Sequence, residues 1–141
     1  MKENAGSEGR TGMDHPAGVH VHASPYSVKE TIDRLQEFLQ KQGVTIYTRI
    51  DQQKEVEASG RKIAPLEFLL FGNPKAGGAI MQENPIAALD LPLKVIAWED
   101  GQQKVWLAHN EAAYIGTRFS LTEATVAVLN MEGPIGKVLK Q

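Results

Sequence analysis

The sequence contains no cysteine. This absence excludes disulfide scaffolds, thiol nucleophiles, and zinc or iron–sulfur sites built on thiolates. Long hydrophobic runs are also lacking, and no stretch approaches the roughly 20 apolar residues that a membrane-spanning helix needs. Neither sign of charge dominates, because 15 basic and 17 acidic residues give a formal net charge of −2. We therefore expect no nucleic-acid partner and no membrane partner.

The N-terminal segment has little apolar character. Residues 1–16 are rich in glycine, serine and charge, and they lack the hydrophobic core of a secretory signal. The composition predicts a disordered tail over 1–16 and a single domain over 17–141. In the absence of a targeting segment, the expected location is the cytoplasm.

The rest of the chain alternates between strand and helix patterns. Apolar alternation predicts strands at 19–23 and 44–50, and a nearly continuous apolar run predicts a strand covered on both faces at 66–71. Two further apolar runs predict strands at 94–99 and 104–108, joined by a tight Asp-Gly turn. A helix over 28–39 begins with a capping box at Ser27–Glu30 and carries an apolar stripe. Short helices are predicted at 52–58 and after the Asn-Pro pairs at 73 and 84, and a C-terminal helix is predicted from a capping box at Ser120–Glu123.

This order of elements indicates the fold class. Strand, helix, four strands and helix fit a two-layer α+β domain, in which helices cover one face of an antiparallel sheet. On the first strand, Val19 and Val21 would face one way while His20 and His22 face the other.

The middle of the chain carries a specific combination of motifs. Phe71–Gly77, Met81-Gln82, Asn84-Pro85 and Ala87–Lys94 closely resemble the domain of unknown function 302 family, and the resemblance extends over about residues 18–130. It implies a TATA-binding-protein-like fold and a homodimer, with no established biochemical function. The family usually carries a histidine after the pair Ile50-Asp51, whereas this chain has Gln52. Histidine chemistry at that position is therefore not expected here.

One candidate ligand site is the loop Gly72–Lys75. Asn73 would cap a helix that starts at Pro74, and the free backbone donors of that helix together with Lys75 would suit a phosphate or carboxylate. The alternative is a helix cap that binds no ligand.

A second candidate is the sheet face away from the helices. If Ile46 and Ile50 point into the core, then Tyr47 and Arg49 share the opposite face with the two histidines and with large apolar side chains. Such a face indicates a homodimer interface, or a small-molecule pocket lined by the aromatic residues and oriented by Arg49 and the histidines. The predicted ligand-binding residues are thus Gly72, Asn73, Pro74, Lys75, Arg49 and Tyr47.

Evidence for a metal or for catalysis is weaker. His20 and His22 could converge on one metal ion, but two ligands without a carboxylate partner are too few, so no metal site is predicted. Glu67 stands in an apolar strand and would suit a general acid if it were buried. We expect a soluble homodimer that binds a small anionic or amphipathic ligand. The alternatives are an enzyme that uses Glu67 or a histidine with an unidentified cofactor, and a protein-interaction module.

Overall fold

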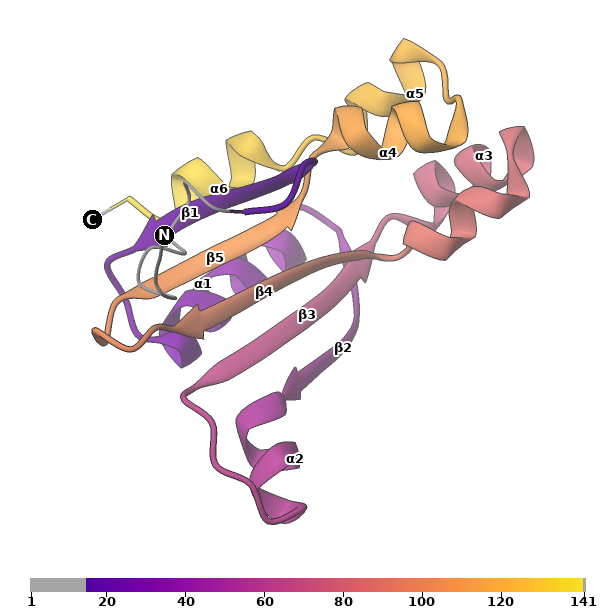
Figure 1. The fold of residues 1–141 in the computed structure, drawn as a ribbon. Coiled ribbons are helices and arrows are strands. Elements are labelled where there is room, and N and C mark those ends of the chain that lie inside the picture. Colours follow the sequence, from indigo (N-terminus) through magenta and orange to yellow (C-terminus); the bar gives the residue numbers. More distant parts are fainter. Residues whose placement is uncertain (1–14, 141) are drawn as a thin grey trace.

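The computed structural model describes residues 15–140, so most of the predicted tail over 1–16 lies outside the described residues. Five strands form one antiparallel sheet in the order β1-β5-β4-β3-β2 (Figure 1). The strands are β1 (Val19–Ser24), β2 (Thr45–Asp51), β3 (Leu66–Gly72), β4 (Leu93–Glu99) and β5 (Val105–Asn110). The central strands are the long apolar runs of the sequence, and β1 and β2 form the edges.

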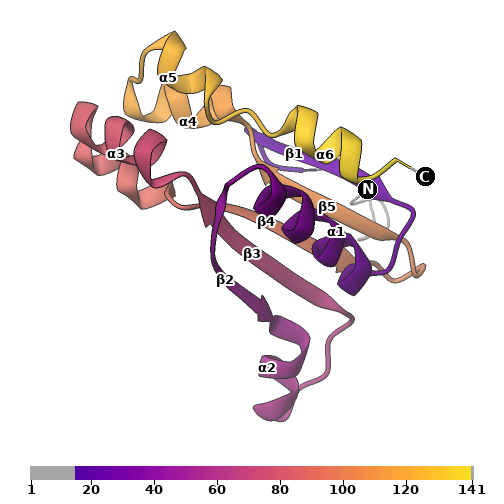
Figure 2. The same ribbon diagram turned by 180° about the vertical axis from the view of Figure 1, so that it is seen from behind.

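The helices fall into three groups. They are α1 (Val28–Lys41), α2 (Gln52–Ala58), α3 (Pro74–Glu83), the 3-10 helix η3 (Pro85–Asp90), α4 (Ala112–Phe119), α5 (Glu123–Ala127) and α6 (Glu132–Val138). Figures 1 and 2 show α1 and α6 over one face of the sheet, α3, α4 and α5 beyond one end, and α2 beyond the other. The predicted two-layer α+β class is confirmed.

The helix-covered face of the sheet holds the main core. The Ser27 side chain accepts a hydrogen bond from the Glu30 backbone N–H and starts α1 as predicted. The stripe that includes Ile32 and Leu35 is fully buried, and it packs on sheet residues such as Leu107 in one cluster. At about 25 cal/mol per Å² of apolar surface, full burial of one such side chain contributes about 1.5–3 kcal/mol, so this stripe fixes α1 on the sheet.

The predicted orientation of the edge strands was wrong. A β-bulge between Ile46 and Thr48 adds one residue to β2 and reverses its alternation, so Ile46 and Arg49 lie on the same, helix-covered face. On β1, His22 pairs with the core residue Leu107, which places both histidines of that strand on the helix-covered face as well. The histidines and Arg49 therefore do not share the uncovered face.

The C-terminal region also differs from the prediction. Ser120 does not start a helix: it ends α4 in the left-handed conformation, with φ 55°. Thr122 is the cap that starts α5, since its side chain accepts from the Thr125 backbone N–H. The turn after β4 is wider than a two-residue turn, and its positive φ of 64° falls on Gln103. Among the helices of residues 15–140, none is long and apolar enough to span a bilayer.

Candidate functional site

Four of the six residues predicted to bind a ligand line one pocket beside α3, which we call the α3 pocket. Tyr47 comes from β2, Gly72 from the end of β3, and Asn73 and Pro74 from the start of α3. The pocket has a volume of about 330 Å³. The rest of its lining is apolar and includes Ala76, Gly77, Ile80, Met81, Leu91, Pro92, Leu93, Val128 and Leu129.

The wall of the α3 pocket exposes hydrophobic side chains to solvent. Tyr47 is 49% exposed, Met81 39% and Val128 57%, although all three are large hydrophobic residues. They come from three distant parts of the chain and meet where α3 faces the segment after α5 (Figure 1). Exposed side chains of this kind are normally scattered singly over a surface, whereas here three of them line one concave site.

The polar groups at the start of α3 already have partners. The Asn73 side chain accepts hydrogen bonds from the backbone N–H groups of Lys75 and Ala76, at 2.9 and 3.3 Å. The Gly77 N–H donates to the Asn73 carbonyl at 2.7 Å. Lys75 is exposed and is not among the described residues that line the pocket. The free donors that an anion would require are therefore occupied by the cap.

Arg49 lies in a polar network on the helix-covered face, away from the α3 pocket. Its Nε donates to Glu67 at 2.9 Å, and its Nη1 donates to Asp33 at 2.6 Å. Further bonds run from the guanidinium to the Gln36 side chain and the Lys29 carbonyl. Glu67 is 7% exposed. The network thus compensates the charge of a buried carboxylate and ties β2 and β3 to α1.

The ionisation of this network follows from its contacts. Burial opposes the charge of Arg49, but the hydrogen bonds that Arg49 donates to Asp33 and Glu67 outweigh it and raise the Arg49 pKa above its ordinary value. The Lys29 ammonium and then the Arg49 guanidinium lower the pKa of Asp33, although burial opposes that shift. Both groups are therefore charged at neutral pH.

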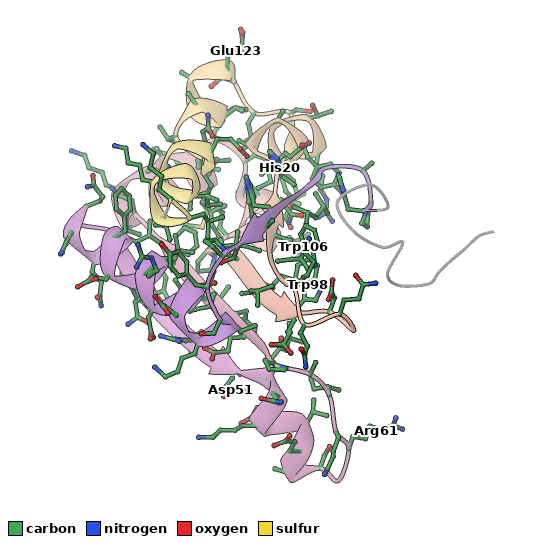
Figure 3. The ribbon with its side chains drawn as sticks, turned by 90° about the vertical axis from the view of Figure 1, so that its left-hand side faces the viewer. His20, Asp51, Arg61, Trp98, Trp106 and Glu123 are labelled. Atoms are coloured by element: carbon green, nitrogen blue, oxygen red, sulfur yellow. The ribbon has the colours of Figure 1, made fainter. Side chains whose placement is uncertain are left out.

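A second group of functional side chains lies where β1, β5 and α6 meet. His20, His22, His109 and Glu132 each offer one ligand atom, and these atoms lie within 4.8 Å of one another. We call this group the histidine cluster. The rings of His20 and His22 stack with centroids 4.1 Å apart, and His22 stacks on His109 at 5.3 Å. Figure 3 shows His20 on β1, and Figure 1 shows α6 running alongside that strand.

The three histidines are in different electrostatic surroundings. His109 is 6% exposed, whereas the side chain of His20 is 40% exposed. Burial, and then the neighbouring His20, lower the pKa of His22 from 6.5 to about 4, against the attraction of Glu132. The His22 imidazole is therefore neutral at pH 7, with one nitrogen lone pair free to accept a hydrogen bond or bind a metal.

Two members of the cluster were not found from the sequence. The fifth strand was predicted to end at residue 108, yet β5 continues to Asn110. Extending the alternation of Val105 and Leu107 by one step would have placed His109 on their face. Glu132 opens a short helix that is distant in sequence, and its position depends on how α6 packs, which no local pattern indicates.

The uncovered face of the sheet is strongly apolar. Figure 3 shows Trp98 and Trp106 on the side of the sheet away from α1, and these two residues pair across β4 and β5. We call this surface the open face; its other large apolar side chains are Val21, Ile50, Leu66, Phe68, Leu70 and Ile96. Lys94 lies on the same face, with its ammonium 4.4 Å from the centre of the Phe68 ring.

A family model described as "Domain of unknown function DUF302" matches residues 20–139. The chain belongs to the DUF302 family. The match includes the α3 pocket, the histidine cluster and all of the sheet except its first residue, Val19. A crystal structure of an uncharacterised conserved DUF302 protein from Bacillus stearothermophilus shares the fold, with a TM-score of 0.72 at 17% sequence identity. The alignment covers 88% of this chain and 97% of that one.

Curated relatives of this DUF302 chain come from Brucella. A protein named fluoride-specific ion channel FluC 1 from Brucella suis is 37% identical over 125 residues, which are 88% of this chain and 49% of that protein. FluC 2 from Brucella melitensis is also 37% identical over 125 residues, or 46% of its length. The DUF302 chain therefore spans about half the length of the curated relatives it matches.

Proposed function

We propose that this DUF302 protein binds a small, largely apolar molecule in the α3 pocket. The observation that carries the proposal is the convergence of Tyr47, Met81 and Val128 on one concave site. A volume of about 330 Å³ lies in the range of ligand pockets, and the lining leaves few polar groups to orient a ligand.

The same lining favours an amphipathic ligand over a simple anion. The backbone donors at the start of α3 are satisfied by Asn73, and Lys75 lies outside the lining. The polar side chains of the lining are the phenol of Tyr47 and the amide of Asn73, and the Asn73 oxygen is already engaged in the helix cap. Transfer of apolar surface from water at about 25 cal/mol per Å² supplies the affinity for such a ligand, and one hydrogen bond from Tyr47 would orient it.

Two adjacent glycines of α3 provide a test position and a control position for ligand binding in the α3 pocket. Gly77 lines the pocket, and a Cβ there would lie 4.0 Å from the Met81 methyl carbon, so a longer side chain would extend into the pocket. A Cβ at Gly78 would meet nothing within 4 Å, and Gly78 is exposed. Both glycines are inside a helix, where replacing Gly with Leu stabilises the helical conformation by a few tenths to about 1 kcal/mol. Both variants are therefore expected to fold.

The probe is the amphipathic dye 1-anilinonaphthalene-8-sulfonate. Its fluorescence is titrated with the wild-type protein, Gly77→Leu and Gly78→Leu, after circular dichroism has established that all three fold alike. We expect a saturable signal whose affinity falls at least tenfold in Gly77→Leu and is unchanged in Gly78→Leu. Equal affinities in the two variants would mean that the dye binds elsewhere, for instance on the open face, and would refute the pocket as the site.

We also propose that the protein self-associates through the open face. Two tryptophans and several large aliphatic side chains lie there, and among the described elements no helix packs on them. A contiguous apolar surface of this kind is unfavourable in water and is typical of a protein interface. A second copy of the chain would bring an identical apolar face, and a twofold dimer would bury both.

A further inference from the structure

We propose that the histidine cluster is a binding site for one divalent transition-metal ion, with His20, His22, His109 and Glu132 as its ligands. This site is separate from the α3 pocket and does not depend on the function proposed for it. The four residues come from two paired strands and from the first turn of α6.

The separations between the ligand atoms fit a single ion. A tetrahedral metal bonded at about 2.0–2.1 Å holds its ligand atoms about 3.3–3.4 Å apart. The Nε2 atoms of His22 and His109 are 3.2 Å apart, and His109 Nε2 is 3.4 Å from Glu132 Oε2. His20 Nδ1 lies 2.7 Å from Glu132 Oε2, and His22 Nε2 lies 3.9 Å from Glu132 Oε1. These distances bracket the tetrahedral value, and every separation within the set of four ligand atoms is at most 4.8 Å.

The backbone already holds the ligands in place. Antiparallel pairing puts His20 directly opposite His109, and His22 follows two residues along the same face of β1. Glu132 is held by the start of α6, where its N–H donates to the Asn130 side chain at 2.8 Å. Because strand pairing and a helix start fix these positions, little chain entropy is lost when an ion binds.

The surroundings of His109 match those of a metal ligand. Its Nδ1 lies 3.0 Å from the Asn110 carbonyl oxygen, which can only accept a hydrogen bond. Nδ1 therefore donates its proton to that carbonyl, and the second ring nitrogen, Nε2, faces His22 and Glu132. A metal-bound histidine usually donates its second ring N–H to a carbonyl or carboxylate in this way, which fixes the tautomer and the ring orientation.

The donor set identifies the class of ion. Three imidazole nitrogens and one carboxylate oxygen suit zinc, copper(II), nickel and related divalent ions, whereas calcium and magnesium prefer oxygen donors alone. The chain has no cysteine to favour copper(I) or an iron–sulfur cluster. Zn²⁺ is the natural probe, and Co²⁺ reports coordination through its visible absorption.

The test is isothermal titration calorimetry, in which untagged, chelator-treated protein is titrated with ZnCl2. Wild type is compared with His20→Gln, His109→Gln and Glu132→Gln, and with two matched controls. His15→Gln changes the one histidine outside the cluster, and Glu123→Gln changes an acidic residue in the first turn of another helix. His20 and Glu132 have side chains 40% and 46% exposed, so their variants keep the test valid if the buried His109→Gln fails to fold.

We expect one Zn²⁺ per chain, bound at least tenfold more weakly by each cluster variant and unchanged by the two controls. Co²⁺ should give the intense visible bands of a tetrahedral site in wild type, and these bands should be lost in Glu132→Gln. Zn²⁺ binding that is absent from the wild type would overturn the proposal. So would binding that resists both His109→Gln and Glu132→Gln, because a chance pair of strand histidines needs neither residue.

Discussion

Replacing Arg49 with methionine should destabilise the fold without weakening ligand binding. Methionine retains most of the aliphatic volume but removes the guanidinium, so the Glu67 carboxylate, with a side chain 10% exposed, loses its cation at 2.9 Å. Breaking a buried ion pair from one side costs about 3–5 kcal/mol. The Arg49 side chain is 24% exposed, which lets some water reach the pair. The side chain of Asp33, the other partner of Arg49, is 43% exposed. An ion pair that is so accessible to water contributes little to the free energy of unfolding. The expected loss is therefore about 2–4 kcal/mol.

The assay is urea unfolding followed by circular dichroism, with the free energy of unfolding obtained by linear extrapolation. Arg49→Lys is the matched control. Lysine keeps the positive charge but lacks the planar guanidinium that donates to Glu67 and Asp33 at the same time, so this variant should lose less stability than Arg49→Met. A loss below about 0.5 kcal/mol in Arg49→Met would refute the structural role, since an unpaired buried carboxylate cannot cost so little. A weaker dye affinity at unchanged stability would instead make Arg49 a ligand-binding residue, as the sequence alone suggested.

Two further predictions concern α3, α4 and α5. Gly116→Ala should cost about 1–3 kcal/mol, because the added Cβ would lie 2.2 Å from Val126 Cγ2. The double variant Gly116→Ala/Val126→Ala should regain most of this in thermal melts, and no recovery would show that the contact is not the cause. Asn73→Ala should cost about 1 kcal/mol through loss of the α3 cap, whereas Lys75→Ala should leave both stability and dye affinity unchanged. A drop in dye affinity with Lys75→Ala would favour an anionic ligand instead.

Local chemistry made much of the fold predictable. Caps act within three residues, so Ser27, Asp51 and Asn73 each marked a helix start that the structure confirms. The apolar stripe of α1 has the period of a helix, and its residues lie in the main core. The nearly continuous apolar run of β3 marked a strand, but the prediction that both its faces are covered was wrong, because Leu66, Phe68 and Leu70 lie on the open face.

Features that depend on packing were missed. The bulge in β2 leaves no clear signature in the sequence, and because side chains alternate with a period of two, one added residue moved Arg49 to the opposite face. The predicted fifth strand ended at residue 108, one residue before His109, so the alternation rule was not applied to this histidine. Glu132 reaches His20 only because α6 packs beside β1, and the two residues are 112 positions apart in the sequence.

The α3 pocket likewise combines residues that the sequence predicted with residues whose place depends on packing. Tyr47, Gly72, Asn73 and Pro74 were predicted from two unrelated arguments, one about a loop and one about a sheet face. The structure brings them to a single pocket, because β2 and β3 are paired and the bulge turns β2 at Tyr47. The apolar walls contributed by Met81 and Val128 arise only when α3 meets the segment after α5.

The central claim is that a dimer carries a small ligand, and native mass spectrometry of untagged protein purified gently from its own host tests it most directly. We predict a particle of two 15.5 kDa chains with a reproducible extra organic mass, and loss of that mass in Gly77→Leu but not in Gly78→Leu. A bound metal would add its own distinct increment and would not be mistaken for the ligand. A monomer without added organic mass would contradict the account, since both the α3 pocket and the open face would then lack the partner proposed for them.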